Sequence, residues 1–320
     1  MNGDGRTEAP WVTHPWVAEG QQRLRFGAGV LSPRSGIAQA IAHARLTEEL
    51  GLDSFWVQDH PTSSPARWST LTALAATTAR LRLGSFVSCV YYRDHFQLAR
   101  LAADVDRLSG GRLILGLGNG DAPGEFGRLG LPWPAVRDRQ AALVTAIGRV
   151  AGLWAAPPAP GGRPVLAAGP VQQPRVPLLI GGGGERVTLR YVARYADVAN
   201  FGPTEQSGGT ADPDVVRRKF AVLRAHCDAR GRPYDSVARS YYLELVLAAT
   251  PAALAAKLRT YYPAGVPAWQ PASLEAAVEY VGALVAAGVQ HVIGAVRGDD
   301  LETLHLFAER VIPAVPGHAR

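Results

Sequence analysis

The feature that most constrains the fold is a regular alternation of short apolar runs with helical patterns after residue 23. The apolar runs predict strands at 24–30, 53–59, 81–90, 112–118, 177–181, 196–201, 239–248 and 289–296. Helical patterns follow them at 35–51, 65–79, 94–110, 136–153, 185–195, 213–230, 272–287 and 299–311. The strand interiors are too apolar for a half-exposed sheet, as is typical of parallel strands buried on both faces. Eight such units in about 300 residues predict an α/β fold, a single closed (β/α)8 TIM barrel.

Three segments fall outside this repeat. The Pro- and Gly-rich stretch 155–176 predicts an insertion after strand four, and 249–271 predicts another after strand seven, with a short helix from Pro251 to Arg259. Residues 1–22 are expected to form a flexible N-terminal tail, which leaves 23–320 as the barrel domain; the alternative is that Trp11 and Trp16 of this segment dock on a neighbour. The alternative is a doubly wound Rossmann sheet. It is disfavoured because the Gly-rich turn at 116–124 follows the fourth strand and opens onto a polar loop.

Composition excludes several classes of protein. The net charge of +6 comes from arginines scattered among carboxylates, without a basic cluster interleaved with aromatic residues, so we expect no nucleic-acid partner. No apolar run approaches the length of a membrane span, and the N-terminus lacks the pattern of a secretory signal. The only cysteines are Cys89 and Cys227, too few for a disulfide framework, which favours a cytoplasmic location.

The stretch LLIGGGGERV, residues 178–187, predicts an anion site. A strand runs into Gly181, Gly182, Gly183 and Gly184 and then into a helix beginning near Val187. Glycines allow the backbone to approach a phosphate closely, and a helix N-terminus favours negative charge. Arg186 adds a charge-assisted contact in this interpretation. The alternatives are a close-packed turn for the glycines and an exposed surface position for the arginine.

In a barrel of this kind the active site forms at the carboxyl ends of the strands. Polar residues gather there at Gln58-Asp59-His60, Ser88-Cys89-Val90-Tyr91-Tyr92, Gly118-Asn119-Gly120-Asp121, the glycine run and Asn200. His60 is a candidate proton donor because imidazole titrates near neutral pH. The other histidines show no metal-ligand spacing, so we expect no metal site.

The order of these segments resembles the luciferase-like flavin and deazaflavin oxidoreductases. The likeness covers residues 24–313 and is carried by ELGLDSFWVQDH (49–60), LSGGRLILGLGNGDAPGEFGRLG (108–130) and QQPRVPLLIGGGGERVTLRYVARYADVANF (172–201). It implies coenzyme F420 as cofactor, with FMN as the alternative, and hydride transfer as the chemistry. It also implies a cis peptide bond after strand three, which we expect at Cys89–Val90. The alternative for Cys89 is a small buried apolar residue.

The resemblance distributes roles among the residues at the strand ends. It implies His60, Asp59 and Asp121 as the catalytic residues, although relatives commonly carry Glu at the last position. The expected cofactor-binding residues are Asp59, Ser88, Cys89, Val90, Asn119, Gly120, Gly181, Gly182, Gly183, Gly184 and Arg186. The expected substrate pocket comprises Tyr91, Tyr92, Trp68 and Asn200, with core packing as the alternative for its aromatic residues.

Departures from the family pattern bear on the substrate. Sugar-phosphate dehydrogenases of this group carry a glutamate after strand one, a tryptophan after the Asp-His step and lysines for the phosphate. Here those places hold Ser32-Pro33, Pro61–Ser64 and the lysine-free 202–209. We therefore expect a larger organic substrate with a carbonyl, imine or activated alkene, of the secondary-metabolite or xenobiotic type.

Other classes of function stay open from the sequence. They are an FMN-dependent monooxygenase, a flavin-binding barrel without turnover, and a barrel without flavin such as an aldolase or hydrolase. The last is disfavoured because no lysine ends a strand. The resemblance also implies a homodimer that pairs through the helices beside strands two and three.

Overall fold

The structure, a computed structural model, describes residues 11–31, 36–156, 166–205 and 208–317. Its centre is a parallel sheet whose strands follow the order β3-β2-β1-β9-β8-β7-β6-β5-β4, and β3 also pairs with β5. The strands are β1 (Arg25–Leu31), β2 (Ser54–Val57), β3 (Arg82–Ser85), β4 (Ser88–Cys89), β5 (Leu113–Gly118), β6 (Leu178–Gly181), β7 (Val198–Phe201), β8 (Ala238–Leu245) and β9 (His291–Arg297). Both β3 and β4 pair with β5, so the two short strands together act as one strand of the barrel. The pairing of β3 with β5 closes the sheet into an eight-stranded barrel. The expected barrel is confirmed, and the Rossmann alternative is wrong.

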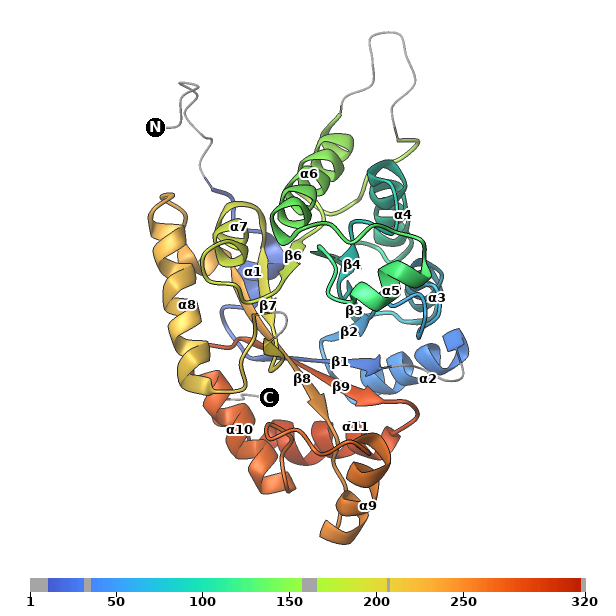
Figure 1. Ribbon diagram of the computed structural model, residues 1–320, viewed down its shortest axis with the longest axis vertical. Helices are drawn as coiled ribbons and strands as arrows, with labels where there is room; N and C mark the ends of the chain where they lie inside the picture. The colour runs from blue at the N-terminus through green and yellow to red at the C-terminus, as the bar shows by residue number, and fades with distance from the viewer. Residues whose placement is uncertain (1–10, 32–35, 157–165, 206–207, 318–320) are drawn as a thin grey trace.

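Helices surround this barrel, as Figure 1 shows. They are α1 (Pro15–Glu19), α2 (Gly36–Glu49), α3 (Arg67–Thr77), α4 (His95–Leu108), α5 (Pro123–Arg128), α6 (Val136–Ala155), α7 (Thr188–Tyr195), α8 (Pro213–Asp228), α9 (Pro251–Tyr261), α10 (Leu274–Ala286) and α11 (Leu301–Leu306). The chain then continues through the π-helical turn η3 (Phe307–Val311) and the 3₁₀ turn η4 (Ile312–Ala314), while the 3₁₀ turn η2 (Tyr234–Ser236) precedes β8. No helix among the described residues is both long and apolar enough to span a bilayer.

The two expected insertions are only partly visible. The short helix predicted from Pro251 is present as α9, which extends to Tyr261. Before β6, residues 169–177 carry no regular helix or strand, and 157–165 lie outside the described residues.

The apolar core has two parts. The larger one lies between the strands and the surrounding helices, where residues such as Leu83, Leu115 and Val192 are fully buried. The smaller one includes Trp16 and Trp56. Gly84 leaves room for Trp56, since a Cβ on this glycine would lie 1.9 Å from the Trp56 ring.

Part of the expected N-terminal tail is packed. Residues 1–10 lie outside the described part, but Pro15–Glu19 forms α1 and Trp16 is 3% exposed. The Arg25 guanidinium lies 4.4 Å from the centre of the Trp16 ring and donates to its carbonyl oxygen at 2.7 Å. Figure 1 shows α1 beside the barrel strands, so the tail expectation is wrong for this helix.

Candidate functional site

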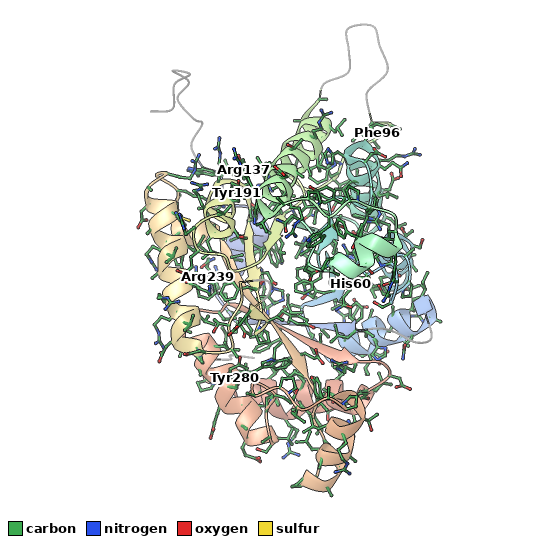
Figure 2. All side chains as sticks on the ribbon, in the orientation of Figure 1. His60, Phe96, Arg137, Tyr191, Arg239 and Tyr280 are labelled. Carbon is green, nitrogen blue, oxygen red and sulfur yellow. The ribbon has the colours of Figure 1, made fainter. Side chains whose placement is uncertain are left out.

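A histidine and a glutamate meet at the carboxyl ends of β2 and β5. His60 follows β2, and Glu125 lies in α5, the short helix after β5 that the sequence had not predicted. The His60 Nδ1 atom is 3.1 Å from Glu125 Oε2. Figure 2 shows His60 below α5 and toward the barrel strands. The imidazole side chain is 35% exposed, whereas the glutamate side chain is 5% exposed, so the pair presents the imidazole to solvent.

Glu125 is held as a carboxylate by a surrounding set of donors. The Thr62 backbone N–H and hydroxyl donate to Oε1 at 3.1 and 3.0 Å, and the Tyr92 hydroxyl donates to Oε2 at 2.8 Å. Burial raises the pKa of Glu125, but the hydrogen bonds from Thr62, Tyr92 and His60 outweigh it and leave the pKa below its ordinary value. An ionised carboxylate is acceptor-only, so His60 Nδ1 must donate its proton to it.

This contact fixes the protonation pattern of His60. With Nδ1–H donating to Glu125, the neutral ring carries its lone pair on Nε2, which has no hydrogen-bond partner among the described residues. The backbone is fixed as well, since the Ser64 hydroxyl donates to the His60 carbonyl oxygen at 2.9 Å. The arrangement is that of an oriented general acid or base whose working nitrogen faces outward.

Asp59, the neighbour of His60, is engaged in a separate network. Arg93 binds its carboxylate through two hydrogen bonds of 2.6 and 2.9 Å, and the Cys89 backbone N–H donates at 3.3 Å. Burial raises the pKa of Asp59, but Arg67 and Arg93 more than compensate and lower it overall. The side chain is 3% exposed, so its contacts favour a positioning role for Asp59 over the expected catalytic one.

Arg67 places a second positive charge beside Asp59. Its guanidinium is completely buried, lies 3.4 Å from the carboxylate and donates to Ser88 Oγ at 2.8 Å. Burial lowers its pKa to about 9. Two arginines facing one carboxylate leave this part of the site positively charged. Neither arginine was singled out from the sequence, where arginines are too numerous for one to stand out.

The cis peptide bond lies three residues before its expected position. It joins Phe86 to Val87, between β3 and β4, and the prediction at Cys89–Val90 is wrong. Both Cys89 and Val90 are buried in the described structure, and burial raises the pKa of the Cys89 thiol to about 11. Cys89 thus occupies the small buried position that was the alternative for it.

The Val87 side chain instead faces the glycines of neighbouring strands. A Cβ on Gly118 would lie 2.4 Å from Val87, and one on Gly181 would lie 3.1 Å from it. These glycines leave room for the Phe86–Val87 step at the ends of β5 and β6.

The turn after β5 carries the next three expected residues. Gly120 has a φ of 84° and faces the Phe126 ring, which a Cβ there would approach to 2.8 Å. Its carbonyl oxygen accepts from Arg139 at 2.5 Å, and Asn119 precedes it, half-buried. Asp121 is exposed. The carboxylate that reaches His60 is therefore Glu125, four residues further on.

The four expected pocket residues divide between the site and the core. Tyr91 and Tyr92 lie beside Phe126, with ring centroids 5.6 and 5.5 Å away. Trp68 is 5% exposed within the larger core, which corresponds to the core alternative. Asn200 is 3% exposed, and its amide donates a hydrogen bond to Ser240 Oγ at 2.8 Å, so this side chain contacts a neighbouring strand of the barrel.

The glycine run after β6 leaves several backbone donors unused. The Gly182 N–H donates to the Asn200 carbonyl, but the N–H groups of Gly183, Gly184 and Arg186 have no acceptor among the described residues. The helix α7 begins directly after them, at Thr188. Consecutive free N–H groups at a helix N-terminus are a suitable anion site, and Arg186 is exposed beside it.

Close packing also explains part of the glycine run. A Cβ on Gly183 would lie 2.4 Å from the Gly208 carbonyl oxygen, so this residue must be glycine for the loop after β7 to approach. Lys219 of α8 is 8% exposed and donates to the Gly183 carbonyl at 2.9 Å. The run thus combines the predicted free donors with the close-packed turn that was its alternative.

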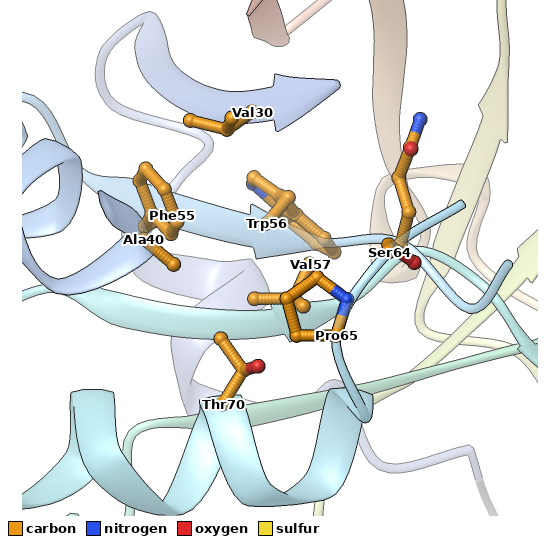
Figure 3. A pocket seen from close by; sticks show the side chains of 9 residues that line it. Val30, Ala40, Phe55, Trp56, Val57, Ser64, Pro65 and Thr70 are labelled. Carbon is orange, nitrogen blue, oxygen red and sulfur yellow. The ribbon is translucent and has the colours of Figure 1, made fainter. Parts of the chain in front are cut away.

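A small space lies near the residues that follow β2. Figure 3 shows a small space lined by Val30, Phe55, Val57, Pro65 and others, of about 20 Å³, room for roughly one water molecule. No group of three or more potential ligands for a metal occurs among the described residues.

The chain is similar in sequence to known dehydrogenases. Over 139 residues the chain is 32% identical to an F420-dependent glucose-6-phosphate dehydrogenase from Amycolatopsis mediterranei, covering 41% of this chain and 42% of that relative. It is 30% identical over 278 residues to the dehydrogenase of the same name from Kineococcus radiotolerans, covering 81% and 78% of the two chains. The chain thus spans about two fifths of the length of the first relative and about four fifths of the second.

A solved structure shares the fold. An F420-dependent secondary alcohol dehydrogenase in complex with an F420–acetone adduct superposes with a TM-score of 0.72 and 19% identity, over 92% of this chain and 99% of that one. Residues 20–292 match the luciferase-like monooxygenase family, a stretch that includes His60, Glu125 and the glycine run. The chain therefore belongs to the luciferase-like monooxygenase family.

Proposed function

We propose that this protein is a coenzyme F420-dependent oxidoreductase that transfers a hydride between the deazaflavin and an organic substrate. The observation that carries the proposal is the His60–Glu125 contact of 3.1 Å at the carboxyl ends of the strands. The names of the relatives, which are F420-dependent dehydrogenases, support the choice of cofactor.

The residues at the strand ends fit a phosphorylated redox ring. The free N–H groups of Gly183, Gly184 and Arg186 would hold the phosphate, and Arg186 would add a positive charge. Gly181 permits close approach beside Val87, where a larger residue would meet the valine side chain at 3.1 Å. Asn119, half-buried beside Gly120, also belongs to the expected binding set, whereas Ser88 is fully buried and its hydroxyl accepts from Arg67. When bound, the deazaflavin supplies a hydride donor or acceptor at carbon.

His60 donates or accepts the proton that accompanies hydride transfer. In the reducing direction its Nε2, when protonated, donates to the substrate oxygen or nitrogen while the substrate carbon receives the hydride. In the oxidising direction Nε2 accepts the hydroxyl proton as the hydride leaves carbon. Glu125 keeps Nδ1 as the donor side of the ring in both directions, and Tyr92 holds Glu125 in place.

The substrate class follows from the lining around this pair. Phe126 packs against Trp133 with ring centroids 4.8 Å apart, and Trp133 remains 39% exposed. With Tyr91 and Tyr92 they form an aromatic wall beside His60. Such a wall suits a carbonyl, imine or activated alkene carried on a sizeable organic molecule, and we expect glucose 6-phosphate to be a poor substrate.

Two other functions would be distinguished by the experiments that test this proposal. The family description supports an FMN-dependent monooxygenase, which requires oxygen for turnover, whereas hydride transfer with F420 proceeds without it. A flavin-binding barrel without turnover is disfavoured because the buried Glu125 carboxylate is still paired with His60.

The direct test replaces His60. The variant His60→Asn should bind F420 about as well as the parent but lose on the order of a hundredfold or more in the rate of hydride transfer under anaerobic conditions. The half-buried His95, at the start of α4, provides the control, since His95→Asn should leave both values unchanged. Equal hydride-transfer rates in parent and His60→Asn would contradict the proposal, and so would oxygen-dependent turnover with FMN alone.

We also propose that the protein is a cytoplasmic homodimer. Two free, buried cysteines, Cys89 and Cys227, support a reducing compartment.

The exposed apolar residues of α4 support the dimer. Phe96 and Leu108 on α4 are 43% and 50% exposed, which supports pairing through the helices that follow strands two and three. A groove of about 540 Å³ lies beside Phe96, between the ends of α4 and α6. Light scattering of the parent and of Phe96→Ser tests this arrangement, and a monomeric parent would contradict it.

A further inference from the structure

We infer that an exposed row of arginines, one in the turn before α7 and two on α7, binds an anionic chain that extends from the cofactor beyond its phosphate. The row, here called the α7 arginine strip, consists of Arg186, Arg190 and Arg194. This inference rests on the proposed function and deepens it, because it states which form of cofactor the site prefers.

The strip carries uncompensated positive charge. All three arginines are exposed, and none forms an ion pair with any residue in the described ranges. The sequence of α7, TLRYVARY, contains no acidic residue. The helix therefore presents cations with no local carboxylate to neutralise them.

Other arginines nearby are paired, which sets the strip apart. On the adjacent helix α8, Arg217 contacts Asp214 at 2.5 Å and Arg218 contacts Glu185 at 3.2 Å. Glu185, the only carboxylate in the turn before α7, is also 3.4 Å from Lys219. Glu185 is thus paired with Arg218 and Lys219 of α8 and does not neutralise the arginines of the strip.

The strip begins where the phosphate site ends. Arg186 lies within the turn whose N–H groups are free, and Arg190 and Arg194 follow at intervals of four residues on one face of α7. Four helical residues span about 6 Å, so Arg190 and Arg194 are spaced like successive carboxylates of a short peptide-like chain. A chain that leaves an anion at the glycine run and follows α7 would meet Arg190 one helical turn from Arg186 and Arg194 one turn further.

Two tyrosines support the guanidinium groups. The Arg190 guanidinium lies 5.9 Å from the ring centre of Tyr191, and that of Arg194 lies 5.1 Å from the ring centre of Tyr195. Figure 2 shows Tyr191 on α7 near Arg137 of α6, a helix that contacts α7. Arg137 is also exposed and adds a fourth cation near the strip. The tyrosines limit the motion of the side chains that would receive the anionic chain.

Charge complementarity selects the ligand class. FMN ends at its phosphate and would leave Arg190 and Arg194 unused. Coenzyme F420 carries, beyond its phosphate, a lactate and a chain of glutamates, so each added glutamate brings a carboxylate. The strip therefore favours F420 with several glutamates over F420 without them, through contacts that salt screens because they are exposed.

The test measures binding with three probes that share one chromophore. These are the deazaflavin without phosphate, F420 with its lactyl phosphate but no glutamate, and F420 with five or more glutamates, each titrated by fluorescence at low and high salt. In the parent we expect the long-chain form to bind about tenfold more tightly than the glutamate-free form at low salt, with the difference largely lost at about 0.5 M salt.

The variant carries Arg186→Gln, Arg190→Gln and Arg194→Gln together. It should bind the long-chain and glutamate-free forms with nearly equal affinity. The matched control, Arg45→Gln with Arg100→Gln and Arg259→Gln, removes the same charge from exposed positions elsewhere and should keep the tenfold preference. Thermal unfolding of both variants reports whether each is folded.

The outcomes separate this inference from the proposed function. If the parent binds both phosphorylated forms equally, or the control loses the preference as fully as the strip variant does, the strip does not bind the chain. The F420-dependent activity would be unaffected by that result. If the folded parent binds none of the three probes, the proposed function itself is wrong.

Discussion

Replacement of Glu125 by glutamine tests how the carboxylate controls His60. The substitution preserves the size of the side chain and an oxygen that can still accept from Thr62. It replaces the other oxygen, which accepts from His60 and Tyr92, with an amide that can donate. The amide therefore favours the opposite ring tautomer, with the proton on His60 Nε2.

The size of the effect follows from the contact that is lost. A hydrogen bond to a charged group contributes about 1.5–3 kcal/mol, and each 1.4 kcal/mol corresponds to a tenfold change in rate. If the His60–Glu125 contact is fully used in the transition state, Glu125→Gln should slow hydride transfer by about 10- to 150-fold. The KM for substrate should change little, because neither atom of the contact binds the substrate.

Stopped-flow measurement of the deazaflavin absorbance under anaerobic conditions gives the rate, and its pH profile gives the mechanism. The pKa of Glu125 lies below its ordinary value, so the parent keeps this carboxylate ionised throughout the neutral range. The loss of this charge 3.1 Å from the imidazole should displace the pH profile of the rate. Tyr92→Phe retains the carboxylate and should cause a smaller loss without that displacement.

The reasoning would be refuted by a folded Glu125→Gln protein whose rate stays within twofold of the parent and whose pH profile is unchanged. An increase in KM alone would also contradict it, because that result would assign Glu125 to substrate binding.

Three further predictions concern the fold. Burial lowers the pKa of His291 to about 3, whereas an unfolded histidine titrates near 6.5, so stability is complete above pH 6.5 and falls by up to about 1.4 kcal/mol per unit as the pH drops toward 3. His291→Gln should flatten this slope in denaturant titrations, and an unchanged slope would assign it to other groups. Trp16→Ala should cost about 3–5 kcal/mol in the free energy of unfolding, since the ring is 3% exposed, and a loss under 1 kcal/mol would mean that α1 is dispensable. Gly84→Ala should prevent stable folding because its Cβ would lie 1.9 Å from Trp56, whereas Gly124→Ala meets nothing within 4 Å and should be tolerated.

The barrel could be predicted because its signal is repeated along the chain. Each buried strand is a short apolar run followed by a helical pattern, and the observed strands fall at the expected places. The helix α1 escaped prediction because five residues are too short for a periodic pattern, and the burial of Trp16 depends on strands far away in the sequence. Local patterns alone do not reveal such long-range packing.

The site was predicted in part. His60 was found because it ends a strand, but its partner was assigned to Asp121 on the basis of resemblance, and the structure brings Glu125 to it instead. A signal was present, since Pro123 and Glu125 occupy the first turn of α5, where proline and acidic residues are favoured. Six residues were too few to establish that helix from sequence.

The Asp59 network was missed for a different reason. Arg67 begins α3 and Arg93 precedes α4, so their convergence on Asp59 depends on the closure of the barrel. In a chain with 33 basic residues, nothing in the sequence distinguishes these two arginines from those at the surface.

The most direct test of the central claim is an equilibrium titration of the purified protein with F420 and with FMN, followed by anaerobic addition of candidate carbonyl substrates to the complex with reduced F420. We expect saturable binding of F420 that is tighter than that of FMN, and substrate-dependent reoxidation of the deazaflavin without oxygen that requires His60. Binding of FMN alone, with product formed only when oxygen is present, would contradict the account.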